Sequence, residues 1–247
     1  MLQHFVRRVT SFFGVDVARI SEQLSDLSPS ERRIVIRARP YTMTSLERIA
    51  ALTQAVEYVI GNNIPGAFVE CGVWKGGSSM AAALTYLELG VRDIDLFLFD
   101  TFAGMPAPGE EDFHAASGKS AQDLLSKSTK LSEVRAYAPI EEVRRNLEST
   151  GYPPDHIHLV EGMVEKTIPH HAPEEISILR LDTDWYSSTK HELTHLFPRL
   201  SRNGVLIVDD YGHWAGAKKA VDEYFSKESL KPLLSRIDQS GRICIKT

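Results

Sequence analysis

Two short apolar runs of this chain end in acidic residues, and these acids are the side chains best suited to chemistry. The run LRLDTDWYSS at 179–188 carries Asp182, and LIVDDYGHW at 206–214 carries Asp209 and Asp210. Ligands of an open parallel sheet collect at the carboxyl ends of its strands, so we expect the three acids to meet there. Oxygen ligands of this kind suit Mg²⁺, which keeps water or substrate oxygens in its remaining positions. The sequence therefore predicts a Mg²⁺ site that is open to a hydroxylated small-molecule acceptor.

A turn rich in glycine follows the first predicted strand, in the segment FVECGVWKGGSS at 68–79. Gly72 permits close backbone approach by a ligand, and Ser78 begins a helix. The segment lacks the glycine spacing of a dinucleotide site and that of a nucleotide phosphate loop. Asp100 ends the next predicted strand, where an acid accepts hydrogen bonds from ribose hydroxyls in doubly wound folds. These features together indicate a nucleoside ligand such as S-adenosylmethionine.

Alternating strand and helix patterns must position these residues, and they predict a parallel α/β sheet with helices on both faces. The expected strands are short apolar runs at 67–74, 93–100, 156–162, 176–182 and 204–210. The expected helices lie at 44–60, 77–89, 139–150, 187–200 and 215–226. Thr44 or Ser45 would cap the first of these helices. Two further runs, 231–237 and 242–247, predict an antiparallel C-terminal hairpin around the turn at 238–241.

Two segments stand outside this alternation. Residues 1–43 are expected to form a helical N-terminal extension, whose first part, MLQHFVRRVTSFFGV, lacks the pattern of a signal peptide or a membrane span. That stretch could be a plain surface helix, or an amphipathic helix that docks on a partner subunit or on a membrane surface. The expected assembly is a homo-oligomer. The segment 103–138 exceeds an ordinary connection, carries an acidic tip at 110–112, and is predicted to be a lid.

Composition narrows the class of protein further. The 247 residues are 43% apolar and 25% charged, which suits one large α/β domain at 44–247 after the extension. A formal net charge of −5 gives no footprint for nucleic acid. The two cysteines, Cys71 and Cys244, are far apart and lack the spacing of a disulfide framework or a zinc site. A reducing cytoplasm is therefore the expected compartment.

The chain resembles the macrocin O-methyltransferase (TylF-like) family over roughly residues 40–225. The motifs that carry the resemblance are YTMTSLERIAAL, IPGAFVECGVWKGGSS, LFLFDTFAGMP, EGMVEKTIP, LRLDTDWYSSTKHEL and VLIVDDYG. The resemblance implies a class I methyltransferase fold, a Rossmann-like sheet. It also implies S-adenosylmethionine as methyl donor, dependence on Mg²⁺, and methylation of a sugar or phenolic hydroxyl of a secondary metabolite such as an antibiotic.

The same resemblance implies roles for individual residues. Asp182, Asp209 and Asp210 would be the metal ligands. Glu70, Gly72, Trp74 and Ser78 would surround the methionine part of the donor, and Asp100 its ribose. Gly162 and its neighbour Met163 would contact the adenine, and Met43 is a further expected donor contact.

The acceptor hydroxyl must lose a proton, and the sequence leaves three candidates for the group that takes it. The family resemblance favours Asp182, although a carboxylate that binds metal is a weakened base. His213 has an ordinary pKa near 6.5 and would not have to give up a ligand role. Asp184 lies two residues beyond Asp182, and it could equally cap the following helix.

Two other functions remain open from the sequence. The segment HELTH at 191–195 matches the zinc-protease pattern literally, so His191, Glu192 and His195 could serve a zinc-dependent hydrolase. Alternatively, the chain could be a non-enzymatic module that binds a nucleoside. Both alternatives leave the three aspartates at the strand ends without a purpose, and the methyltransferase is therefore the favoured prediction.

Overall fold

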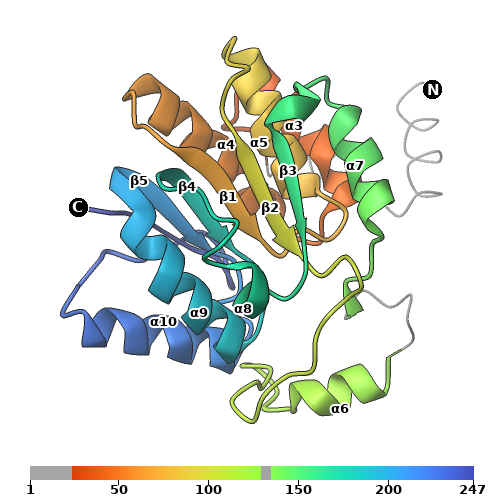
Figure 1. Cartoon of the computed structure of the whole chain (residues 1–247), viewed down its shortest axis with the longest axis vertical. Coiled ribbons are helices and arrows are strands. Elements are labelled where there is room, and N and C mark those ends of the chain that lie inside the picture. The colour runs from red at the N-terminus through yellow and green to blue at the C-terminus, as the bar shows by residue number, and fades with distance from the viewer. Residues whose placement is uncertain (1–23, 129–134) are drawn as a thin grey trace.

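The structure, a computed structural model, describes residues 24–128 and 135–247. Its centre is a seven-stranded sheet in the order β3-β2-β1-β4-β5-β7-β6 (Figure 1). The strands are β1 (Ala67–Cys71), β2 (Leu96–Asp100), β3 (Ile157–Glu161), β4 (Ile176–Leu181), β5 (Leu200–Val208), β6 (Ser235–Arg236) and β7 (Arg242–Ile245). Each of the five predicted parallel strands is present within a few residues of its expected place.

The direction of the strands agrees with the prediction. The pairs β1–β2, β1–β4, β2–β3 and β4–β5 are parallel, and the chain reverses its winding between β1 and β4. The antiparallel strand β7 pairs with both β5 and β6. The predicted C-terminal hairpin is thus confirmed, and it extends the sheet beyond β5.

Helices cover both faces of the sheet (Figure 1). The helices are α3 (Pro29–Ala38), α4 (Leu46–Gly61), α5 (Gly77–Glu88), α6 (Ala121–Ser126), α7 (Ile140–Glu148), α8 (Val164–Thr167), α9 (Tyr186–Leu196) and α10 (Ala215–Lys227). Short 3₁₀ turns lie at Arg39–Tyr41, Pro154–His156 and Phe197–Arg199. Ser45 is the N-cap of α4, because its hydroxyl accepts a hydrogen bond from the Arg48 amide at 3.2 Å.

The strands are buried on both faces because successive side chains point to opposite sides. On β1, Phe68 packs with α4, α5 and α7, while Val69 and Cys71 pack with α8, α9 and α10. Complete burial of such a side chain contributes roughly 1.5–3 kcal/mol. These two apolar layers hold the strand ends, and therefore the acids that follow them, at fixed positions.

The described part of the N-terminal extension is not separate from the main domain. Ile34, Val35 and Ala38 of α3 pack into one cluster with residues of α4 and α5. The stretch MLQHFVRRVTSFFGV lies outside the described residues. No helix in the described ranges combines the length and apolar character needed to cross a membrane.

Of the predicted lid, the structure describes residues 103–128 and 135–138, and residues 103–128 are called the cap. It contains α6 and lies beyond the carboxyl ends of the strands, at the lower edge of Figure 1. Ala121 and Leu125 of α6 share a small apolar cluster with Trp185 and Trp214. The cap is therefore packed against the segments that follow β4 and β5. Whether it moves as a lid stays a prediction.

Candidate active site

A cavity of about 660 Å³ opens at the carboxyl ends of β1, β2, β4 and β5. All eight residues predicted to bind the donor line this cavity, and so do the predicted metal ligands and His213. The donor set is Met43, Glu70, Gly72, Trp74, Ser78, Asp100, Gly162 and Met163. Residues from six separate stretches of sequence are thus brought to one site, as the topology of a doubly wound sheet requires.

The glycine turn after β1 lies against the backbone of the strand end that carries Asp182, whereas the predicted approach of a ligand to Gly72 stays a prediction. Gly72 has φ 85°, and a Cβ atom there would overlap the backbone oxygen of Asp182. Trp74 also has a positive φ, 48°, and the helix α5 begins three residues later, at Gly77. A side chain at position 72 would therefore push β1 away from the strand end that carries Asp182.

Asp100 holds this turn in place. Its Oδ2 accepts hydrogen bonds from the amides of Val73 at 2.7 Å and Trp74 at 2.9 Å, and its Oδ1 accepts one from Phe102 at 2.8 Å. Burial raises the pKa of Asp100, and the three amide donors oppose that shift. The carboxylate still lines the cavity, so it can both shape the turn and face a ligand.

Glu70 is buried and has two side-chain partners that the sequence did not indicate. Its side chain is 1% exposed, Oε1 lies 2.5 Å from Arg180 Nη1, and Oε2 accepts a hydrogen bond from the Ser79 hydroxyl. Two strong partners thus occupy this carboxylate. Its predicted contact with the methionine part of the donor stays a prediction.

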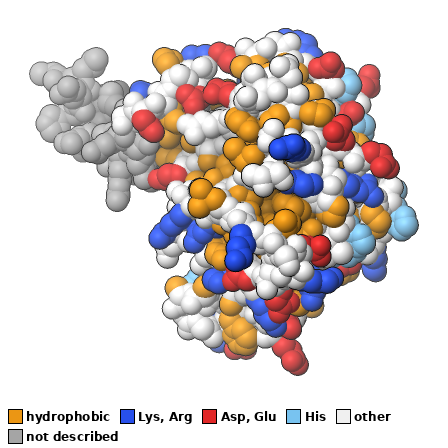
Figure 2. Space-filling model, turned by 90° about the vertical axis from the view of Figure 1, so that its left-hand side faces the viewer, with side chains coloured by type: hydrophobic (Ala, Val, Ile, Leu, Met, Phe, Trp, Pro, Cys, Tyr) orange, Lys and Arg blue, Asp and Glu red, His pale blue; other side chains and the backbone are white. Residues whose placement is uncertain are grey.

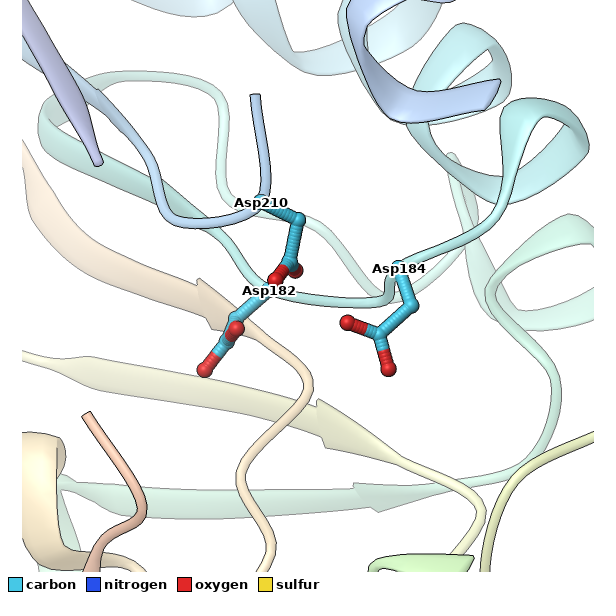
Figure 3. A group of neighbouring side chains, drawn as sticks. All are labelled: Asp182, Asp184 and Asp210. Atoms are coloured by element: carbon cyan, nitrogen blue, oxygen red, sulfur yellow. The ribbon is translucent and has the colours of Figure 1, made fainter. Parts of the chain in front are cut away.

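Three aspartates form a compact group at the ends of β4 and β5 (Figure 3). One carboxylate oxygen from each of Asp182, Asp184 and Asp210 lies within 4.8 Å of the others. Asp210 Oδ2 is buried and has no hydrogen-bond partner among the described residues. Like charges this close repel each other unless a proton or a cation is shared between them. We call Asp182, Asp184 and Asp210 the acid group.

The pKa values of the acid group reflect this crowding. Burial raises the pKa of Asp182 and of Asp210 well above the ordinary value, and the neighbouring carboxylates add to the shift. Burial and the charge of Asp182 raise the pKa of Asp184 to about 7. A carboxyl group with such a pKa can exchange protons near neutral pH.

The acid group differs by one residue from the predicted metal ligands, because Asp209 is held by two guanidinium groups. Asp209 Oδ1 lies 2.6 Å from Arg180 Nη2, and Oδ2 forms an ion pair with Arg48 Nη1. The Thr44 hydroxyl also donates to Oδ2, at 3.1 Å. Asp209 therefore lies beside the acid group, and Asp184 takes the third place in it.

Arg180 is the main residue that the sequence reasoning missed. It lies on β4 two residues before Asp182, hence on the same face, and its side chain is only 3% exposed. Burial alone would lower its pKa, but the carboxylates of Asp182, Asp209 and Glu70 outweigh that effect and raise it. An arginine within an apolar strand was the available signal, since a buried cation needs acidic partners.

Two histidines also line the cavity. His213 lies 4.8 Å from His114 of the cap, measured between ring centroids. Burial lowers the pKa of His213, and the neighbouring His114 and Arg48 act in the same direction. His213 is therefore a neutral base at physiological pH, within the same cavity as the acid group.

The segment HELTH does not bring three potential metal ligands together among the described residues. The rings of His191 and His195 lie 4.4 Å apart, but His191 Nε2 donates to the Ile168 carbonyl at 3.0 Å. Glu192 is buried against the Thr183 hydroxyl, and its pKa is raised to about 8 by burial. In the described ranges, the acid group is the one set of three or more His, Cys, Asp or Glu side chains close enough to share an ion.

Comparisons with known proteins bear directly on this arrangement. The model of the macrocin O-methyltransferase family, TylF, matches residues 19–245. The chain belongs to this family. It is 36% identical over 204 residues to a demethyldecarbamoylnovobiocin O-methyltransferase of Streptomyces niveus, covering 83% of this chain and 75% of the relative.

Two further comparisons agree. A Streptomyces olivaceus enzyme is 34% identical over 203 residues, which cover 81% of this chain and 74% of the relative. Its name is 8-demethyl-8-(2,3-dimethoxy-alpha-L-rhamnosyl)-tetracenomycin-C 4'-O-methyltransferase. The solved structure of the O-methyltransferase NovP superposes with a TM-score of 0.73 at 34% identity, covering 84% of this chain and 82% of that one. The predicted class I methyltransferase fold is confirmed. The chain is an S-adenosylmethionine-dependent O-methyltransferase.

Proposed function

We propose that this enzyme moves a methyl group from S-adenosylmethionine to a hydroxyl of a sugar or phenolic ring in an antibiotic-like small molecule, with the help of Mg²⁺. The named relatives act on antibiotic intermediates, and one name specifies a position of a rhamnosyl group. The observation that carries the proposal is the acid group, which shares one cavity with the glycine turn. A donor and a cation-bound acceptor would thus be held side by side.

Donor binding is proposed for the side of the cavity formed by the glycine turn. Asp100 would accept hydrogen bonds from the ribose hydroxyls, and the methionine part would lie along Gly72 and Trp74, which line the cavity. Gly162 has φ 140° and donates its amide to the Asp100 carbonyl at 2.9 Å, so it belongs to the same surface. Met163 and Met43 would contribute apolar contacts to the adenine side.

The cation site is proposed for Asp182 and Asp210, with the third ligand from Asp209, as predicted, or from Asp184. The residues fit a divalent cation, because all are hard oxygen donors and Asp210 Oδ2 lacks a partner among the described residues. Arg48 and Arg180 already balance part of the negative charge. When bound there, Mg²⁺ would lower the pKa of an acceptor hydroxyl in contact with it.

The reaction forms a carbon–oxygen bond to the acceptor and breaks the sulfur–methyl bond, which leaves neutral S-adenosylhomocysteine. The acceptor proton must pass to a group of the enzyme or to water. We propose that Asp184 takes it when Asp209 supplies the third ligand of the cation, because Asp184 then lies within the acid group without binding the metal itself. Asp182 and His213 are the other two candidates, and His213 lines the same cavity.

We also propose that the enzyme works as a cytoplasmic homo-oligomer without nucleic acid or membrane partners. Both cysteines are buried free thiols, which supports a reducing compartment. On the face shown in Figure 2, acidic and basic side chains are interspersed, which supports the absence of a nucleic-acid footprint. Light scattering at several protein concentrations tests the oligomer.

Calorimetry tests the binding part of this proposal most simply. S-adenosylmethionine should bind with and without Mg²⁺, because the donor side of the cavity has its own contacts. An acceptor panel of rhamnosides and catechols should then bind only when Mg²⁺ is present. Donor binding that is absent under both conditions would contradict the assignment of the glycine turn.

A further inference from the structure

The tip of the cap contains a buried acid that the proposed chemistry does not use. Asp112 is only 1% exposed although it belongs to a long surface connection. Its Oδ1 accepts a hydrogen bond from the Tyr186 amide at 2.8 Å, and its Oδ2 accepts one from the Gly109 amide at 2.7 Å. A carboxylate buried with both oxygens engaged is a specific anchor, since a buried charge persists only when it is paired.

The first partner belongs to the helix that follows the acid group. Tyr186 is the first residue of α9, and its amide is one of those that a helix leaves without an internal partner. The N-terminal end of a helix carries partial positive charge, which favours a carboxylate there. Asp112 therefore caps α9 from a separate segment of the chain.

A second helix begins at the same carboxylate. Gly216 is the second residue of α10, and a Cβ atom at this position would overlap Asp112 Oδ1. The same Cβ would also lie 3.1 Å from the Tyr186 amide nitrogen. The missing side chain at position 216 thus makes room for the Asp112 carboxylate between the first turns of α9 and α10.

This carboxylate lies next to the turn that carries Asp184. Asp184 has φ 69°, and the Trp185 amide donates to the Thr183 carbonyl at 2.8 Å, which closes a tight three-residue turn. Such a conformation is strained for a residue other than glycine and persists only where neighbours fix it. The next amide along the chain, that of Tyr186, is the one that Asp112 binds.

Further hydrogen bonds hold the cap against the segments that follow β4 and β5. The Trp185 indole donates to the Pro106 carbonyl at 3.1 Å, and the Ala215 amide donates to the Phe113 carbonyl at 2.9 Å. The Ala115 amide donates to the His213 carbonyl at 2.8 Å. The cap that these hydrogen bonds hold contributes several side chains to the cavity wall: Met105, His114, Ser117, Lys119 and Leu124.

We propose that Asp112 is a positioning residue that fixes the cap as a permanent wall of the acceptor side, in place of the moving lid that the sequence predicts. Through Tyr186 it would also hold the Asp184 turn in the acid group. The acceptor role of this wall rests on the proposed function, whereas the anchoring does not. Because both effects use one carboxylate, losing it should disturb the cap and the acid group together. The donor side is built from other loops and should be unaffected.

The test uses two variants that remove the anchor from opposite sides. Asp112→Ala deletes the carboxylate, and Gly216→Ala displaces it by filling its space. The control Glu111→Gln removes one negative charge at the adjacent position, where the side chain makes only a 3.7 Å ion pair with Lys219. Trypsin cleavage after Lys119 and Lys127, mapped by mass spectrometry, reports on the cap. Calorimetry with S-adenosylhomocysteine and with Mn²⁺ alone reports on the two sides of the cavity.

In both anchor variants, cleavage at these two lysines should accelerate by about tenfold or more, since local opening exposes them. Mn²⁺ affinity should fall about fivefold or more, while S-adenosylhomocysteine affinity stays within about twofold, the scale of an unperturbed site. The double variant should show changes in cleavage rate and Mn²⁺ affinity no larger than those of either single variant, because the two substitutions remove the same contact. The control should match the wild type in all three measurements.

Wild-type cleavage rates in folded Asp112→Ala and Gly216→Ala proteins would overturn the anchor. Equal losses of donor and cation affinity would also overturn it, because they indicate general unfolding. If Asp112→Ala does not fold, Asp112→Asn, which keeps one acceptor oxygen, replaces it. This variant should show the same pattern with smaller changes: faster cleavage and weaker Mn²⁺ binding, but unchanged affinity for S-adenosylhomocysteine. None of these measurements requires turnover, so a failure of the proposed methyl transfer would be distinguishable from a failure of the anchor.

Discussion

Replacing Asp184 by asparagine should make the cation-free enzyme more stable at alkaline pH while impairing its chemistry. The pKa of Asp184 is about 7 in the folded protein, against an ordinary value of 3.8. The unfolded chain therefore releases this proton at lower pH than the folded protein does. The free energy of unfolding of the wild type falls as pH rises from about 4 to about 7, and the stability lost over this range is not regained at higher pH.

The size of the effect follows from the shift. One pKa unit corresponds to about 1.36 kcal/mol, so a shift of roughly three units amounts to about 4 kcal/mol. The side chain faces a cavity that admits solvent, and screening reduces the expected gain to about 2–4 kcal/mol. Asparagine also tolerates the positive φ at this position, 69°, which should add slightly to the stability.

Denaturant unfolding of wild type and Asp184→Asn, in EDTA at pH 8 and pH 4.5, measures this difference. The variant should be more stable at pH 8, and the gain should shrink to within about 1 kcal/mol at pH 4.5, where the wild-type carboxyl is protonated in the folded state. Mg²⁺ should stabilise the wild type more than the variant. Asp155→Asn, at an exposed position, serves as the control. A gain of equal size at both pH values, or a less stable variant at pH 8, would refute the reasoning.

Three further outcomes are expected. Asp100→Ala should weaken S-adenosylhomocysteine binding about ten- to hundredfold by calorimetry, because a charged acceptor of ribose and amide hydrogen bonds is lost; unchanged affinity in a folded variant would rule out this role. His191→Gln should leave turnover within about twofold and elemental analysis should find no zinc, whereas loss of activity would return the hydrolase to consideration. Glu192→Gln should be more stable than wild type above pH 8 by about 3–5 kcal/mol. Burial raises the Glu192 pKa to about 8, so the free energy of unfolding of the wild type falls between about pH 4.5 and 8. The same pH dependence of stability in both proteins would contradict this expectation.

Much of the fold could be predicted from the sequence because its signals are local. Apolar runs of strand length, bounded by turn residues, identified all five parallel strands, and the run at 242–247 identified β7. The topology then placed Gly72, Asp100 and Asp182 around one cavity, since the carboxyl ends of parallel strands meet at one edge.

The arrangement within the acid group could not be predicted, because it depends on distant partners. Arg48 comes from α4, 161 residues before Asp209, and no local pattern indicates that this arginine holds the Asp209 carboxylate. Asp184 joins the acid group because the chain takes a left-handed turn after β4, where the sequence allowed a continued strand or a helix cap. The buried position of Asp112 was equally hidden, since an acidic loop tip usually faces water.

The most direct test of the account is methyl transfer from labelled S-adenosylmethionine to a panel of rhamnosides and catechols, in EDTA and in Mg²⁺, by wild type and Asp210→Asn. The account predicts transfer by the wild type only in Mg²⁺. It also predicts little transfer by Asp210→Asn under either condition, although that variant should bind S-adenosylhomocysteine within about twofold of wild type. Undiminished transfer in chelator, or full activity of Asp210→Asn, would contradict the assignment of the acid group to a catalytic cation.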